Sequence, residues 1–191
     1  MPRITLPTPE SYTPEQQRIH TEVVAGRGRL FGPYRAALLR PELAERWHRL
    51  SMLFGEGGRV PRRLRELALL VCARFWNAKV EWWAHAPIAL KEGVSMEVIE
   101  AMRTGDRPKF TVTDEQAVYD FCTEMLEHHI ISQPTYDRAL GILDPIGIVE
   151  LGMALGHYTM AAFTLIAHEI PIPDQDMEPY QVLPEIRTPN A

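Results

Sequence analysis

Cysteine is scarce in this chain, and long blocks of basic residues are absent. Cys72 and Cys122 are the only two cysteines among 191 residues, and each lies in an apolar run. We therefore expect buried free thiols and exclude a disulfide-stapled scaffold. The net charge of −5 is mild and spread along the chain. The few clusters of Lys and Arg lie within amphipathic helices, so the sequence predicts no nucleic-acid partner.

A secretory signal pattern is also missing from the N-terminus, so we expect a cytoplasmic protein. One apolar stretch, residues 146–167, is long enough to cross a bilayer. It contains Glu150 and His157, however, and Gly152 and Gly156 lower its hydropathy. A charged residue inside a lone membrane span costs several kcal/mol. We therefore predict no membrane span and interpret this stretch as the central helix of a soluble bundle.

No segment shows the alternating polar and apolar residues of a half-buried strand. Apolar residues make up 46% of the chain and charged residues 24%, which is ordinary globular composition. The sequence thus predicts an all-α fold, a compact multi-helix bundle forming a single domain over residues 1–191. Its helical core is expected at about 41–169. Proline-rich arms, 1–12 and 170–191, are expected to fray or to lie across a neighbouring surface.

Caps and breakers predict where the helices begin and end. Thr13 to Gln16 and Thr113 to Gln116 have the pattern of capping boxes. Asn77 has the residue type of an N-cap, and Asp144-Pro145 that of a cap followed by a first-turn proline. The expected helices are 13–26, 43–54, 61–75, 77–93, 96–103, 113–128, 133–143 and 146–169.

The stretch from Asn77 to Pro87 carries the best functional clue. If it is helical, Glu81 and His85 are four residues apart and share one face, and the preceding apolar helix can bring Glu66 against them. Two carboxylates and an imidazole form a plausible proton-transfer site. We expect the helix dipole to favour the ionised form of Glu81, and Glu81 to hold His85 in one tautomer.

Proline at position 87 makes a further prediction about this helix. Pro87 has no N–H to offer the carbonyl of Trp83, so a kink with a free acceptor is expected beside His85. Alternatively, Pro87 is itself the first residue of a helix. Glu81 and His85 would then lie on the preceding turn, and the argument that they share a face would weaken.

Each candidate also has a plain structural interpretation. Glu81 and His85 could form an ordinary surface pair, Trp82 and Trp83 could be packing residues, and Glu66 could pair with Arg62 or Arg63. His157 is either a satisfied core histidine or a second polar group facing the site. Di-metal sites in bundles use Glu-x-x-His from paired helices, a pattern this sequence lacks, so we predict no metal.

Two segments resemble a known family. Residues 65–70 (Arg-Glu-Leu-Ala-Leu-Leu) and 81–94 (Glu-Trp-Trp-Ala-His-Ala-Pro-Ile-Ala-Leu-Lys-Glu-Gly-Val) resemble the carboxymuconolactone decarboxylase-like family of the alkylhydroperoxidase D-like superfamily. The resemblance covers about residues 45–105 and extends more weakly to the helix with His157. It implies an all-helical subunit that assembles into trimers or hexamers, with a site between helices near a subunit boundary.

The resemblance also implies which chemistry to expect. The family's peroxidase branch has a Cys-x-x-Cys pair, and Ala78 and Glu81 stand at those two positions here, whereas His85 and Glu66 match the family's histidine and glutamate. The missing thiols argue against peroxidase activity. A cofactor-free lyase is implied instead, acting on a small carboxylated lactone or a related aromatic-catabolism acid. His85 would be the acid/base catalyst, oriented by Glu81 and Glu66.

The remaining expectations concern the substrate and the alternatives. Arg62, Arg63 or Arg65 could clamp an anionic substrate, and the residues assigned to substrate binding are Trp82, Trp83, Arg65, His157 and Tyr158. An alternative is a non-catalytic, oligomeric small-molecule-binding protein, in which Glu66, Glu81 and His85 satisfy one another in a closed core. Residual peroxidase activity is a third possibility.

Overall fold

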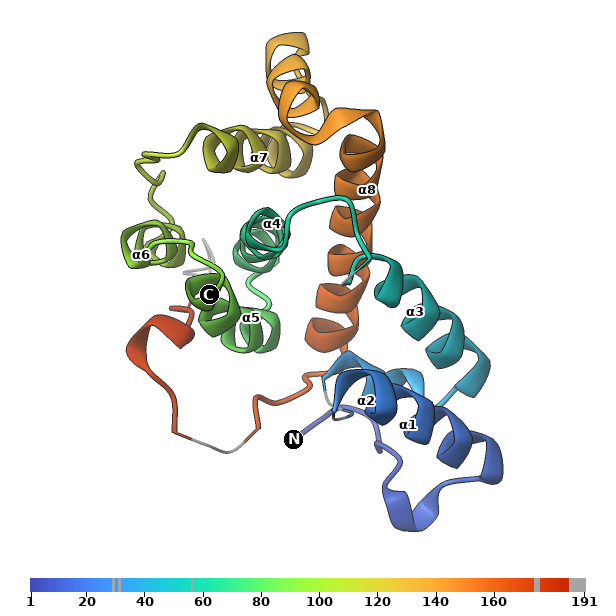
Figure 1. The fold of residues 1–191 in the computed structure, drawn as a ribbon. Helices are drawn as coiled ribbons and strands as arrows, with labels where there is room; N and C mark the ends of the chain where they lie inside the picture. The colour runs from blue at the N-terminus through green and yellow to red at the C-terminus, as the bar shows by residue number, and fades with distance from the viewer. Residues whose placement is uncertain (29, 31, 56, 174–175, 186–191) are drawn as a thin grey trace.

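Helices form the whole regular structure of the residues described here, in a computed structural model that covers 1–28, 30, 32–55, 57–173 and 176–185 (Figure 1). No strand occurs among them. The all-α prediction is confirmed. The α-helices are α1 Pro14–Arg27, α2 Pro33–Ala37, α3 Pro41–Leu53, α4 Arg62–Trp76, α5 Lys79–Lys91, α6 Met96–Thr104, α7 Thr113–Thr123 and α8 Gln133–Ala167.

Helix α4 occupies the middle of the molecule, with α5, α6, α7 and α8 around it (Figure 1). Residues 66–73 of α4 are buried without interruption, so the helix is covered on every side. Its apolar side chains and those of its neighbours form the main core. The prediction that the last long helix is the central one was wrong, because α8 packs on one side only and leaves its outer face in solvent.

Helix α8 is bent where the sequence predicted a boundary. Asp144 has φ 60° and ψ 174°, which breaks the helical path between its two halves. The Asp144 carboxylate accepts hydrogen bonds from the backbone N–H groups of Ile146 (2.9 Å) and Gly147 (3.0 Å), and so caps the second half. It also accepts from the guanidinium of Arg59 (2.6 Å). The predicted cap at Asp144-Pro145 is therefore confirmed.

Replacing this cap should weaken the fold measurably. Asp144→Ala removes the acceptor for two backbone N–H groups, and loss of such a cap costs about 1–2 kcal/mol. Urea denaturation should show that decrease in the free energy of unfolding. Asp137→Ala, which removes only an exposed bond to Gln133 one turn away, should change it by less than about 0.5 kcal/mol. Equal stability of Asp144→Ala and the unmodified chain would contradict this role.

Two other predicted caps differ from the structure. Asn77 does not begin α5; it ends α4 in the left-handed conformation, with φ 52°. Asparagine suits either position, since its side chain tolerates that backbone region. Ala78 is the residue that precedes α5. The second predicted capping box is also absent, because α7 begins at Thr113 after Val112, with no side-chain cap, whereas the box at Thr13 is confirmed.

Both arms contact their own bundle. The N-terminal arm is tied to the end of α8 by a hydrogen bond from the N–H of Arg3 to the carbonyl of His168 (3.0 Å), and Leu6 is buried. The C-terminal arm crosses α5 and α6, where Leu183 is buried and Arg103 donates to the carbonyl of Val182. Residues 174–175 and 186–191 lie outside the described residues.

Among the described residues, α8 is the one helix whose length and apolar composition would allow it to cross a membrane. Its inner face nevertheless packs in the protein core, against α4 and α7. Glu150, the charged residue in its stretch 146–167, accepts hydrogen bonds from the N–H groups of Arg59 (2.8 Å) and Val60 (3.1 Å). The helix thus also fixes the loop that leads into α4.

Candidate functional site

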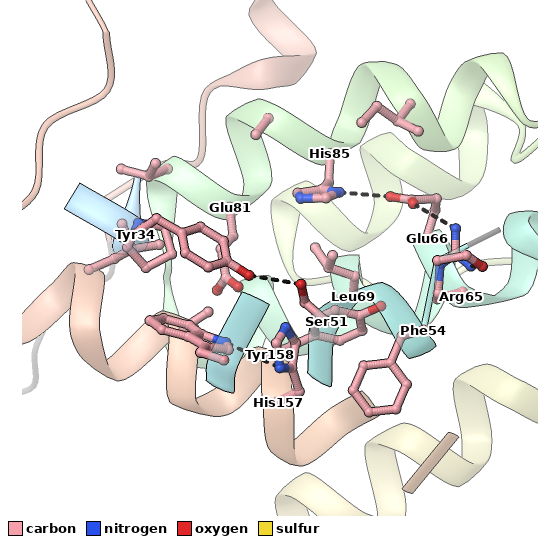
Figure 2. Close-up of a pocket in the computed structure, with 18 residues that line it drawn as sticks. Tyr34, Ser51, Phe54, Arg65, Glu66, Leu69, Glu81, His85, His157 and Tyr158 are labelled. Atoms are coloured by element: carbon pink, nitrogen blue, oxygen red, sulfur yellow. Dashed lines mark hydrogen bonds and ion pairs between the residues drawn. The ribbon is translucent and has the colours of Figure 1, made fainter. Parts of the chain in front are cut away.

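A cavity of about 320 Å³ lies between α4, α5, α8 and the short helices α2 and α3 (Figure 2). That volume suits a small metabolite. Its described lining residues combine apolar walls with ionisable groups, and they include Tyr34, Trp47, Ser51, Phe54, Arg65, Glu66, Leu69, Glu81, His85, His157 and Tyr158. Six of the sequence-predicted site residues therefore line one space: Arg65, Glu66, Glu81, His85, His157 and Tyr158.

The strongest polar contact in this cavity joins α5 to α4. His85 Nδ1–H donates to Oε2 of Glu66 at 2.8 Å. Burial alone would raise the pKa of Glu66, but the hydrogen bond from His85 and the nearby charges of His85 and Arg65 outweigh it and hold that pKa below its ordinary value. The ionised carboxylate accepts the Nδ1 proton and so fixes the orientation of the ring, which leaves Nε2 as the nitrogen that can exchange a proton with a substrate. The prediction that Glu81 holds His85 in one tautomer was wrong, because the imidazole ring is hydrogen-bonded to Glu66 instead.

Glu81 lies in the first turn of α5, as predicted, and its side chain points into the same space as His85 (Figure 2). It is buried, and its Oε2 has no hydrogen-bond partner among the described residues. Burial raises the pKa of Glu81 to about 8. The expectation that the helix dipole keeps Glu81 ionised was therefore wrong, because desolvation outweighs the dipole. At neutral pH this carboxyl keeps its proton.

Helices α2 and α3 contribute a polar wall that sequence reasoning missed. Trp47 Nε1–H donates to Nδ1 of His157 at 3.2 Å, which requires a neutral imidazole with its proton on Nε2. Tyr34 donates its hydroxyl proton to Ser51 at 2.8 Å. Nothing in the spacing of these residues signals such contacts. Helix α2 lies before residue 41, so the segment placed outside the expected core helps to form the cavity.

Arg65 is the only Lys or Arg among the described residues that line the cavity. Its guanidinium donates to the carbonyl of Gly55 at 2.9 Å and lies 3.8 Å from Glu66. The other two candidate clamps point elsewhere: Arg62 pairs with Glu92, and Arg63 pairs with Asp114 and Glu115. Glu66 therefore does not pair with Arg62 or Arg63, which was the plain interpretation.

Trp82 and Trp83 do not line the cavity, contrary to their assignment as substrate-binding residues. Both are buried on other faces of α5, and Trp82 donates its indole N–H to the carbonyl of Tyr180 at 2.8 Å. Helix α5 continues through Pro87, so Glu81 and His85 share a face as first expected. The carbonyl of Trp83 is not free, since the Gln181 side-chain amide donates to it at 3.3 Å.

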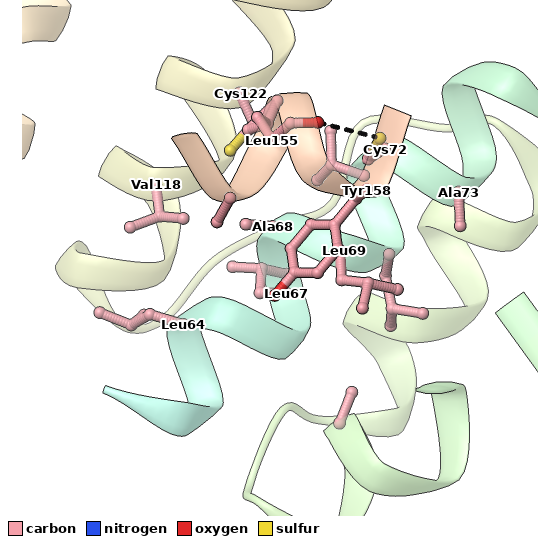
Figure 3. Packing of buried hydrophobic residues seen from close by; sticks show 14 of the residues in the cluster. Leu64, Leu67, Ala68, Leu69, Cys72, Ala73, Val118, Cys122, Leu155 and Tyr158 are labelled. Carbon is pink, nitrogen blue, oxygen red and sulfur yellow. Dashed lines mark hydrogen bonds between the residues drawn. The ribbon is translucent and has the colours of Figure 1, made fainter. Parts of the chain in front are cut away.

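The two cysteines lie in the main core and not in the cavity (Figure 3). Both are free thiols, as predicted. Burial raises the pKa of Cys72 to about 12, despite a contact with Thr159, and burial also raises the pKa of Cys122. Since the thiolate is the nucleophile in thiol chemistry, neither residue is suited to attack a peroxide.

The cavity therefore contains one ionised carboxylate and one protonated carboxyl group. Glu66 is ionised and orients His85, whereas the buried Glu81 is a neutral proton donor. Neighbouring carboxyl groups with pKa values pushed apart are typical of acid/base sites. In the part of the chain that the structure describes, no group of three or more His, Cys, Asp or Glu side chains has a metal-binding arrangement.

Comparison with known proteins does not show which family the chain belongs to. The interpretation of the site depends on the contacts of Glu66, Glu81 and His85, and the likeness of residues 45–105 to the decarboxylase-like family stays a prediction. No family model matches the chain, and no curated protein matches it.

Proposed function

We propose that the protein is a cofactor-free lyase of the carboxymuconolactone decarboxylase-like kind. Its substrate would be a small carboxylated lactone or a related aromatic-catabolism acid, and it would work in the cytoplasm. The observation that carries this proposal is the bond between His85 Nδ1 and Glu66 at the wall of a cavity. A histidine held by a carboxylate, with its other nitrogen available, is a common general acid/base arrangement.

In the proposed reaction, the bond between the carboxyl group and the lactone ring breaks and CO₂ leaves. The electron pair passes into the ring as an enolate. Doubly protonated His85 then delivers its Nε2 proton to the carbon that lost CO₂, while the Glu66 carboxylate stabilises the imidazolium. Glu81, protonated below about pH 8, donates a hydrogen bond to the enolate oxygen, where negative charge develops. One proton from solvent returns the site to its starting state.

Arg65 has the role of orienting the anionic substrate in this proposal. A guanidinium binds a carboxylate with two parallel hydrogen bonds. The side chain of Arg65 is mostly buried beside Glu66, and its contact with Gly55 fixes the position of the guanidinium. His157 and Tyr158 provide polar groups on the opposite wall, from α8.

The observed cavity also bears on the alternatives. A closed core, in which the three groups satisfy only one another, predicts no space beside them, whereas a cavity of about 320 Å³ is present. Thiol-dependent peroxide reduction requires a reactive thiolate, and the burial of Cys72 and Cys122 opposes its formation.

A ligand-stabilisation screen tests the substrate class directly. Carboxylated lactones should raise the melting temperature of the unmodified chain, and the same lactones without the carboxyl group should not. Arg65→Gln should remove most of that increase, because the carboxylate loses its cationic partner. Arg62→Gln is the matched control, since Arg62 lies on the same helix but pairs with Glu92. If no carboxylated ring compound stabilises the protein, the proposed substrate class is wrong.

A further inference from the structure

The outer face of α8 carries an unusually long surface without charge. Ile146 is 67% exposed, Val149 62%, Met153 57% and Phe163 50%. Met160 and Ile166 are also exposed, and no Lys, Arg, Asp or Glu lies among them. These six residues, together with Gly156 and Ala167, form what we call the α8 outer stripe, which lies entirely on the second half of α8, after the break at Asp144. At 1.5 Å per residue it is about 32 Å long, and soluble monomers rarely leave so long an apolar surface uncovered.

The stripe continues onto a neighbouring aromatic group. Phe163 packs edge-on against Trp76 of α4, with ring centroids 4.6 Å apart, and Trp76 packs edge-on against Phe75. Phe75 is itself exposed. Protein interfaces are enriched in aromatic residues and methionine and depleted of charge at their centre, and the stripe with its aromatic edge has that composition.

The spacing of the stripe makes it complementary to a second copy of itself. Its positions 146, 149, 153, 156, 160 and 163, all on the second half of α8, are symmetric about a point between residues 154 and 155. In an antiparallel pair, Met153 would therefore face Gly156 of the other copy. Val149 would face Met160, and Ile146 would face Phe163. Such a contact uses the same patch on both chains, as two-fold interfaces do.

Gly156 in the stripe, and Gly152 one turn before it, leave room for close approach. A Cβ atom added to Gly152 or Gly156 would meet nothing within 4 Å. Small residues four apart let two helices approach closely, and the Met153 side chain of the opposite copy could fill the space above Gly156. The same helix thus provides both a projecting side chain, Met153, and a space that can receive it, above Gly156.

We infer that two copies of this chain associate through antiparallel packing of their α8 outer stripes. A membrane surface is the competing occupant. Helices that lie on membranes carry Lys or Arg beside their apolar face, whereas α8 has neither after Arg138, and the whole chain has a net charge of −5. An uncharged, self-complementary stripe fits another copy better than an anionic lipid surface. A larger assembly would be built from such pairs and would contain an even number of copies.

Molar mass in solution tests the pairing. The unmodified chain should have a mass of two copies, or of a larger even number, by light scattering after size exclusion. Met153→Glu places one carboxylate from each copy next to the two-fold centre of the contact and should weaken association roughly 100-fold or more. Glutamate is as good a helix former as methionine, so the monomer should keep its helicity. Leu43→Glu is the control: Leu43 is 50% exposed on α3, outside the stripe, and the mass should not change.

Cross-linking tests the antiparallel arrangement without a disruptive charge. A mixture of Val149→Cys and Met160→Cys chains should form a disulfide between copies under mild oxidation. Val149→Cys alone should not, because the two cysteines would be offset by about 16 Å along the helix. A single-copy or odd-numbered mass, an unchanged mass for Met153→Glu, or cross-linking of Val149→Cys alone would overturn the proposal. So would a monomer that floats with phosphatidylcholine–phosphatidylglycerol vesicles.

Discussion

His85→Gln should lower turnover of the proposed lactone substrate by about 10²- to 10⁴-fold, the usual contribution of a general acid/base group. Glutamine can still donate a hydrogen bond to Glu66, but it cannot carry a proton to the substrate. The decrease should appear in kcat more than in KM, because the ring acts on the reacting carbon and contributes little to ground-state binding. The assay follows CO₂ release from the lactone that best stabilises the protein.

A matched histidine variant keeps this result interpretable. His128 ends the π-helical turn Glu124–His128 and lies outside the described cavity lining. His128→Gln should keep full turnover. His85→Gln should keep the circular dichroism spectrum and molar mass of the unmodified chain, so that lost activity reflects lost chemistry. Turnover of His85→Gln within about twofold of the unmodified chain would rule out the proposed role.

Glu81→Gln should change how stability depends on pH. The unfolded chain releases the Glu81 proton near the ordinary carboxyl pKa, whereas the folded chain keeps it up to about pH 8. Between these values the folded state binds more protons, so stability falls as pH rises. The fall ends above about pH 8, where both states are ionised. Each unit of pKa difference corresponds to 1.36 kcal/mol, so the full effect reaches several kcal/mol.

Glutamine imitates the protonated carboxyl and removes this dependence. At pH 5 the Glu81→Gln variant and the unmodified chain should have similar free energies of unfolding. At pH 8.5 the variant should be the more stable protein by several kcal/mol. Glu66 contributes with the opposite sign, since its lowered pKa adds stability that is lost only under acidic conditions. The measurement is the melting temperature of both proteins from pH 5 to pH 9. If the curve of Glu81→Gln runs parallel to that of the unmodified chain, Glu81 is ionised in the folded protein and the prediction is wrong.

Local sequence signals predicted the helices well. Thr13 and Asp144 are caps whose side chains reach backbone N–H groups only a few residues away, so residue type and position suffice to place them. Asn77 shows the limit of such signals. Its side chain suits the start of one helix and the end of another, and the packing of α4 against α5 decides between them.

The sequence predicted which residues line the site, but not which of them form hydrogen bonds with one another. Glu66, Glu81 and His85 do line one cavity, because an i,i+4 pair on one helix and a residue on the preceding helix meet when the helices pack. Which carboxylate binds the ring depends on how α4 and α5 are positioned. The protonation of Glu81 depends on burial by elements remote in sequence. The bond from Trp47 to His157 joins residues 110 positions apart, and no local pattern encodes it.

Gln181 has a consequence for how the protein is made. Pro87 leaves the carbonyl of Trp83 without its helical donor, and Gln181 supplies one from 98 residues downstream. A ribosome synthesises the chain from the N-terminus, so α5 emerges long before its missing donor does. The carbonyl of Trp83 therefore gains this donor only after the segment that carries Gln181 has left the exit tunnel. Deleting residues 179–185 would act on the helix that carries Glu81 and His85, even though those residues are remote from it in the chain.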